Sequence, residues 1–202
     1  MSSHQFSSND YLNNEQVCKI LSEDQNIIDI ITENLLNVYE NTYMCDSFEI
    51  LGNGVRITYK PRLVNHSALP PIILNFQPYI NQDAMTNAID RCYQVQVQKN
   101  QLPLILFICS ERLSDPILDL FVPLQGNSYL YYLPDTFWSQ KCLLISEHSF
   151  KRNIGDDKNI NGLAVLAMFL LQENQAIAKI GKSKDTATQE LYIKCKNIFY
   201  FD

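Results

Sequence analysis

The feature that most constrains the fold is an almost unbroken apolar run, Leu104–Cys109. A strand with apolar side chains on both faces must be covered on both sides, as in a parallel or mixed sheet between helices. A second run of this kind is Ile72–Gln77, and between the two Asn81 suits the N-cap of a helix that should reach about Lys99. The sequence therefore predicts an α/β fold with a mixed central sheet flanked by helices.

Upstream of these strands the pattern predicts two helices, over Asp10–Ser22 and Asp24–Asn41. The second is amphipathic, and we expect Asp29 on its polar face. Its apolar stripe, which should bury against the sheet, comprises Ile27, Ile28, Ile31, Leu35 and Val38.

A β-hairpin is expected between these helices and the central strands. The short alternating runs Ser47–Leu51 and Val55–Lys60 flank Asn53 and Gly54, the dipeptide that best tolerates the positive φ angles of a tight turn. The predicted order is then helix, strand, strand, strand, helix, strand.

The remainder of the chain predicts a C-terminal elaboration that ends in helices. We expect a short helix over Pro116–Phe121, strands over Tyr129–Leu133 and Lys141–Ser146, and a final helix over Thr186–Phe199. Asn161 should cap one further helix, which is so apolar that it must be buried or shared with a partner.

Composition and charge restrict the class of protein. A chain of 202 residues with 46% hydrophobic content fits a single α/β domain over residues 10–202, preceded by a flexible serine-rich tail, residues 1–9. The start lacks an apolar signal segment, and no apolar run reaches the ~18 residues of a membrane span, which predicts an intracellular protein, cytoplasmic or nuclear, without membrane contact. The net charge of −6 disfavours nucleic acid as a partner, although it leaves this possible.

Common catalytic motifs are absent from the sequence. It has no GxSxG, GxxxxGK[ST] or HExxH motif and no dinucleotide-binding glycine turn. The six cysteines are scattered without a CxxC pair, which predicts buried free thiols and neither a zinc site nor a disulfide framework. The three histidines lie far apart in polar stretches, so no catalytic histidine is expected.

One segment nevertheless resembles a known family. Leu69–Gln77 reads LPPIILNFQ, and after a predicted helix Leu102–Cys109 reads LPLILFIC. This arrangement resembles the PD-(D/E)XK nuclease-like superfamily, in particular the branch of transposase-associated nucleases from mobile elements and their eukaryotic relatives. The resemblance covers about residues 24–109 and implies a restriction-endonuclease-like core.

The resemblance also implies where a metal site would lie. In that family an Asp and a Glu on adjacent strands hold Mg²⁺, which activates water for phosphodiester hydrolysis. The Glu position falls on Asn75, the polar residue of this branch on Gln77, and the Asp near Arg56. An amide and a guanidinium cannot supply two anionic oxygen ligands, so the resemblance implies a degenerate, inactive site with no metal or other cofactor.

Two alternatives stay open at this point. Acids elsewhere could restore a Mg²⁺ site and thus a DNA nuclease: Glu49, otherwise a solvent-facing strand residue, is the first candidate, followed by Asp46, Asp83 and Asp90. The chain could also be an unrelated α/β domain whose Asn75 and Gln77 are ordinary polar residues on a half-exposed strand.

The hypothesis that follows is a catalytically inactive protein-interaction or structural module with an unidentified protein partner. Aromatic residues either anchor that partner or fill the core. They are Tyr129, Tyr131, Tyr132, Phe137 and Trp138, together with the ending Ile198–Phe201.

Overall fold

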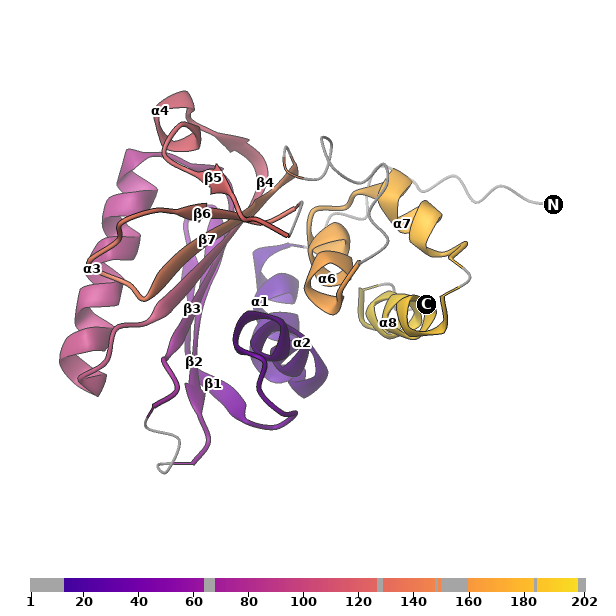
Figure 1. The fold of residues 1–202 in the computed structure, drawn as a ribbon, viewed down its shortest axis with the longest axis horizontal. Coiled ribbons are helices and arrows are strands. Elements are labelled where there is room, and N and C mark those ends of the chain that lie inside the picture. The colour runs from indigo at the N-terminus through magenta and orange to yellow at the C-terminus, as the bar shows by residue number, and fades with distance from the viewer. Residues whose placement is uncertain are drawn as a thin grey trace.

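The backbone is organised around a mixed sheet, which has seven strands in the part of the chain that the structure describes (Figure 1). The structure is a computed structural model, and it describes residues 13–63, 68–126, 129–147, 149, 160–183 and 185–199. The strands are β1 (Tyr43–Leu51), β2 (Gly54–Pro61), β3 (Ile72–Ile80), β4 (Leu104–Leu113), β5 (Val122–Pro123), β6 (Tyr131–Leu133) and β7 (Lys141–Ser146). Their order is β1-β2-β3-β4-β7-β6-β5. The central strands β3, β4 and β7 are parallel, and all other neighbours are antiparallel.

Helices cover both faces of the sheet. They are α1 (Asn14–Glu23), α2 (Gln25–Leu36), α3 (Gln82–Lys99), α4 (Asp115–Leu118), α6 (Gly162–Leu170), α7 (Asn174–Ile180) and α8 (Thr186–Phe199). One face carries α3 and α4, and the other carries α1, α2 and the C-terminal helices (Figure 1). The predicted mixed α/β fold with a sheet flanked by helices is therefore confirmed.

Two apolar cores lie on the two faces because side chains alternate along the strands. Ile72 and Leu74 of β3 belong to the core beneath α1, α2 and α6, whereas Ile73 belongs to the core beneath α3 together with Phe107 of β4. Every residue of Leu104–Cys109 is buried. The sequence prediction that this run is covered on both sides is confirmed.

The two N-terminal helices differ from the prediction at their ends. Helix α1 begins at Asn14, whereas the first part of the predicted range, residues 10–12, lies outside the described residues. The N-cap Asn13 forms a capping box with Gln16: each backbone N–H donates to the side-chain oxygen of the other residue. Helix α2 stops at Leu36 rather than Asn41, because Asn37 takes a left-handed conformation with φ of 53°.

Asp29 was expected on the solvent face of α2, and that prediction is wrong. The side chain is buried, and its Oδ1 accepts hydrogen bonds of 2.8 Å from the Asn41 backbone N–H and from the Gln25 amide. A buried carboxylate needs such partners, and these also fix the loop that leads into β1. The apolar stripe itself packs as predicted, with Ile27, Ile28 and Ile31 buried.

The hairpin of β1 and β2 is confirmed, but its turn lies one residue earlier than expected. Gly54 pairs with Leu51, so the two-residue turn is Gly52–Asn53. The positive φ that motivated the prediction is not used, because among the described glycines only Gly126 has one. Strand β1 begins at Tyr43 instead of Ser47, and its register shifts between Cys45 and Ser47.

The unit β3-α3-β4 follows the predicted order. Asn81 caps α3, since its Oδ1 accepts a 2.9 Å hydrogen bond from the Ala84 N–H. Both strands run further than predicted, β3 to Ile80 and β4 to Leu113. The register between them shifts around Pro78, which has no N–H to donate.

The C-terminal helices close the core on the α1 face. All nine residues of α6 are buried, and Asn161 caps it through a 3.0 Å hydrogen bond from the Ala164 N–H, as predicted. Helix α7 was not predicted. Within the described ranges, none of the helices is long and apolar enough to cross a membrane.

Four of the aromatic candidates for partner contacts fill the core. Tyr129, Tyr131, Trp138 and Phe199 are buried, whereas Phe137 is 87% exposed. Residues 200–202 and the tail, residues 1–9, lie outside the described residues. Core packing therefore accounts for the buried four.

Candidate functional site

The strands β1, β2 and β3 bring the predicted site residues into one row. Glu49 pairs with Arg56, and Arg56 pairs with Asn75, so the three residues lie side by side across the sheet. Gln77 follows two positions after Asn75 and therefore shares its face, which is the face that α3 covers. The structure thus brings Arg56, Asn75, Gln77 and Glu49 together.

Arg56 is the centre of this row. Its Nε donates a 3.0 Å hydrogen bond to Asn75 Oδ1, and its Nη1 donates a 3.2 Å hydrogen bond to Glu49 Oε2. Arg56 is 8% exposed and Asn75 is fully buried, so the expectation of a half-exposed strand is wrong. Burial lowers the pKa of Arg56; Glu49 opposes that shift, while Arg91 adds to it. The guanidinium nevertheless stays charged at neutral pH.

A second arginine, Arg91 of α3, reaches down to the same carboxylate. Its Nη1 lies 3.6 Å from Glu49 Oε1, and its Nη2 donates to Ser47 Oγ at 2.9 Å and to Thr58 Oγ1 at 3.3 Å. Glu49 is therefore not simply a solvent-facing strand residue, although its side chain is 41% exposed. Two guanidinium groups share this one carboxylate.

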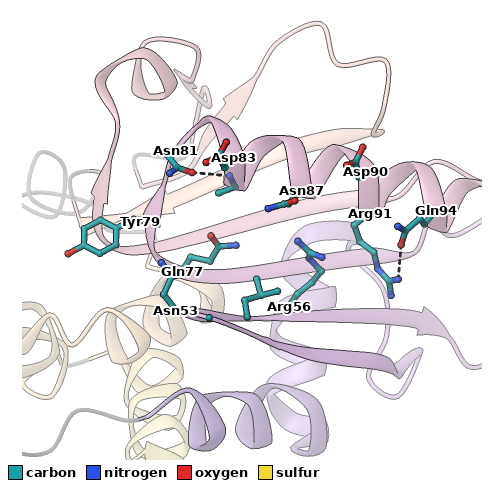
Figure 2. A pocket seen from close by; sticks show the side chains of 13 residues that line it. Asn53, Arg56, Gln77, Tyr79, Asn81, Asp83, Asn87, Asp90, Arg91 and Gln94 are labelled. Carbon is teal, nitrogen blue, oxygen red and sulfur yellow. Dashed lines mark hydrogen bonds between the residues drawn. The ribbon is translucent and has the colours of Figure 1, made fainter.

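Arg91 was not recognised from the sequence, although a usable signal exists. Asn87, Arg91 and Gln94 recur at steps of four and three, which places them on one side of α3, next to the apolar stripe. All three residues line the pocket that lies over the arginines (Figure 2). A polar stripe that borders an apolar one on a single helix would have indicated a site wall.

The pocket has a volume of about 540 Å³ and lies between the β1–β2 turn and α3 (Figure 2). Arg56 and Gln77 form its floor, α3 contributes one wall, and Asn53 lies on the turn opposite. Gln77 is only 5% exposed. No described residue forms a hydrogen bond with the Gln77 side chain, which Figure 2 shows pointing from β3 towards α3.

Gly54 explains how Gln77 is positioned. A β-carbon on Gly54 would lie 2.3 Å from Phe76 O and 2.8 Å from Gln77 Cγ, so only glycine lets β2 approach β3 this closely. The glycine is needed for close packing rather than for a positive φ. It thus supports the floor of the pocket.

The remaining candidate acids divide into two groups. Asp83 and Asp90 line the pocket from α3, whereas Asp46 lies elsewhere and forms ion pairs with Lys60 at 2.6 Å and Lys99 at 3.2 Å. Asp83 and Asp90 are seven residues apart on one helix, which corresponds to roughly 10 Å along its axis. Neither acid belongs to a group of three or more His, Cys, Asp or Glu that could hold a metal ion among the described residues.

The donor set at Arg56, Asn75 and Gln77 does not fit a magnesium ion. Mg²⁺ requires anionic oxygen ligands, but both Glu49 oxygens face guanidinium groups and Asn75 Oδ1 already accepts from Arg56. A guanidinium at the same place repels a cation. Consistently, no cluster of three or more His, Cys, Asp or Glu suited to a metal occurs in the part of the chain searched, the described residues.

None of the six cysteines lines this pocket. All six cysteines are free, as predicted. Five of them are buried, as expected, whereas Cys45 is only half-buried. The three histidines, at positions 4, 66 and 148, lie outside the described residues.

Comparisons with protein-family models, curated proteins and solved structures give no significant match for this chain.

Proposed function

We propose that the chain is a catalytically inactive relative of the PD-(D/E)XK nucleases that acts inside the cell as a protein-interaction or structural module. The observation that carries this proposal is the position of Arg56. Its guanidinium lies where the resemblance puts a metal-binding Asp, and it hydrogen-bonds Asn75, which lies where the resemblance puts the Glu. A site that once held a cation would thereby have become a cationic site itself.

The connectivity around the pocket supports the nuclease-like part of the proposal. The antiparallel pair β2–β3 is followed by the helix α3 and the parallel neighbour β4. This strand, strand, helix, strand order agrees with the order that the resemblance implies, and Arg56 and Asn75 lie on the adjacent strands β2 and β3. Fold analogy supports ancestry only, so the loss of activity is argued from the residues of the site.

The free edge of the sheet supports the protein-partner part. Strand β1 is the first strand of the sheet order, and no described strand pairs with its outer edge. Phe48 and Ile50 on this strand are each more than half exposed. An extended peptide from a partner could add to such an edge and cover both side chains. The net charge of −6 favours a protein partner over nucleic acid.

The decisive test of inactivity is a calorimetric titration with Mg²⁺ and Mn²⁺, run beside cleavage assays on single- and double-stranded DNA. We expect neither saturable metal binding nor cleavage, because the carboxylate nearest to the site is held by two arginines. Metal-dependent cleavage by the wild-type chain would overturn the proposal.

The alternative function, a Mg²⁺-dependent nuclease with rearranged ligands, has one observation in its favour. Asp83 and Asp90 line the same pocket as Arg56 and Gln77. If cleavage were detected, Asp83→Asn, Asp90→Asn and Glu49→Gln would identify the acids that carry it. Loss of cleavage in any of these variants, with unchanged folding by circular dichroism, would establish the alternative.

The partner hypothesis needs a test of its own. The variant Phe48→Asp places a charge on the exposed part of β1, and Tyr93→Asp makes the matched change on the exposed face of α3. Proteins captured by the wild-type chain should be lost with Phe48→Asp and retained with Tyr93→Asp. Equal capture by both variants would exclude β1 as the docking strand.

A further inference from the structure

The charges at the floor of the pocket are not balanced among themselves. Arg56 and Arg91 share Glu49, at 3.2 Å and 3.6 Å, and no other described carboxylate forms an ion pair with either arginine. Two positive charges against one negative charge leave an excess of one positive charge within this group of three, while Asp83 and Asp90 carry negative charge on the α3 wall of the pocket. Because Arg56 is almost fully buried, water screens this charge only in part.

Hydrogen-bond donors at the same place also remain unused. Arg56 uses Nε for Asn75 and Nη1 for Glu49, and its Nη2 has no partner among the described residues. The neighbouring Gln77 is 5% exposed as a whole residue, and its side-chain amide, which lines the pocket, has no hydrogen-bond partner among the described residues either. The fully buried donors without a partner are their neighbours Asn75 Nδ2 and Arg91 Nε. Buried polar groups are nearly always hydrogen-bonded, so the donors around Arg56 outnumber the acceptors that the described chain supplies.

The pocket above these donors has room for a small molecule. Its volume of about 540 Å³ lies within the usual range of ligand sites, roughly 300–1,000 Å³. Its lining is rich in polar side chains, among them Asn53, Asn87 and Gln94 (Figure 2). An apolar ligand would leave these groups without hydrogen-bond partners.

We infer that this pocket binds a small oxyanion, a phosphate or a carboxylate group, through the unused donors of Arg56 and Gln77. A guanidinium and an adjacent amide N–H together match two oxygens of such a group. Asp83 and Asp90 on the α3 wall limit the ligand to one or two negative charges, because a polyanion would bring further charges against them. The same carboxylates can accept hydrogen bonds from hydroxyl or amino groups on the remainder of the ligand.

This inference goes beyond the proposed function, because it assigns a ligand class to the pocket and requires no protein partner. It shares with the proposed function the premise that arginine has replaced metal ligands. The two are separated by running the binding experiment in EDTA and again with Mg²⁺. Oxyanion binding that requires Mg²⁺ would contradict both statements, whereas no binding under either condition would contradict only the present one.

The test is a titration of ¹⁵N-labelled protein with inorganic phosphate and, separately, with acetate at constant ionic strength. We expect saturable shifts of the Arg56 Nε–Hε signal and of the backbone amides of Gln77 and Asn87 for at least one of the two anions. The anion that binds more tightly shows whether the pocket prefers a phosphate or a carboxylate group. Linear, unsaturable shifts with both anions would overturn the inference and would mean that the pocket holds solvent only.

Two matched variants establish the site. Gln77→Met keeps the length of the side chain and the total charge, and it should weaken binding by about tenfold or more, since one hydrogen bond to a charged group is lost. Gln96→Met makes the same change at an exposed position of α3 outside the pocket and should leave the affinity unchanged. Equal weakening by both variants, or by neither, would overturn the assignment to Arg56 and Gln77.

Discussion

Gly54 lies directly against Gln77: a β-carbon at Gly54 would come within 2.8 Å of Gln77 Cγ and 2.3 Å of the preceding carbonyl oxygen, that of Phe76. The contact joins the start of β2 to the pocket floor. Because the nearer atom belongs to the backbone, it cannot move aside as a flexible side chain would.

The first prediction concerns this contact. Gly54→Ala should destabilise the fold by about 1–3 kcal/mol, as overpacking of a well-packed site does. Gly52→Ala is the matched control, because a β-carbon there has no atom within 4 Å. Chemical denaturation of the two variants checks the prediction, and equal stability of both would contradict the close approach of β2 to β3.

The second prediction concerns the buried guanidinium. Arg56→Met should cost about 2–3 kcal/mol, because Asn75 loses its hydrogen-bond donor inside the sheet. The loss of the ion pair with Glu49 adds less to this cost, because the half-exposed Glu49 carboxylate still pairs with Arg91 and is hydrated by water. Arg112→Met, at an exposed position, should change the unfolding free energy by no more than about 0.5 kcal/mol. Similar values for the two variants would show that Arg56 is not structurally required.

The third prediction is a pH dependence at the register shift in β1. Burial favours the neutral form of Asp46, but hydrogen bonds from Lys60 and Lys99 outweigh it and hold the pKa of Asp46 below its ordinary value of 3.8. A lowered folded-state pKa gives stability that is complete above the ordinary value and is lost as the pH falls through the lowered one.

The wild-type chain should therefore exceed Asp46→Asn in stability by about 0.5–1 kcal/mol at pH 7, because the two lysines are partly exposed. Urea denaturation at several pH values should show this difference shrinking below about pH 4. The combination of Lys60→Gln and Lys99→Gln should remove the difference at every pH. A difference that grows towards low pH would contradict the assignment.

The fourth prediction concerns thiol reactivity. Burial raises the pKa of Cys92 to about 12 and that of Cys109 to about 11, so neither thiol is ionised at pH 8. Cys45 is also shifted upwards, chiefly by burial, but it is half-buried and accessible. Pulsed alkylation followed by mass spectrometry should therefore label Cys45 first, and the other two only after denaturant is added. Labelling of Cys92 at the rate of Cys45 would show that α3 does not hold it against the sheet.

Local sequence signals predicted the elements better than their ends. Asn81 and Asn161 precede apolar helical patterns, and both cap helices as expected. The end of α2 was predicted too late because the apolar stripe continues to Val38. The left-handed conformation of Asn37, which ends the helix, does not alter the spacing of the apolar residues. Asp29 was misplaced for a related reason: its hydrogen-bond donor on Asn41 belongs to a loop whose path no local pattern specifies.

The site was predictable on the sheet but not on the helix. The short hairpin fixes the register of β1 and β2, so the pairing of Glu49 with Arg56 follows from the sequence. The approach of Arg56 to Asn75, on strands joined by a longer loop, was expected only from the family resemblance. The position of Arg91 depends on how α3 is rotated above the sheet. That rotation is set by Ala88, Cys92 and Val95, which are buried on the apolar side of the helix, and by the strands beneath them. Such packing cannot be read from the helix alone.

The burial of α6 has a consequence for synthesis on the ribosome. This helix packs against α2 at one end of the chain and against α8 at the other, and it completes the core on a sheet face built from β2, β3 and β4. While the chain is being made from its N-terminus, those strands emerge long before Gly162–Leu170 does. A nascent chain must therefore hold one apolar sheet face incompletely covered until Gly162–Leu170 has been made, and exposed apolar surface of this kind favours aggregation in that interval.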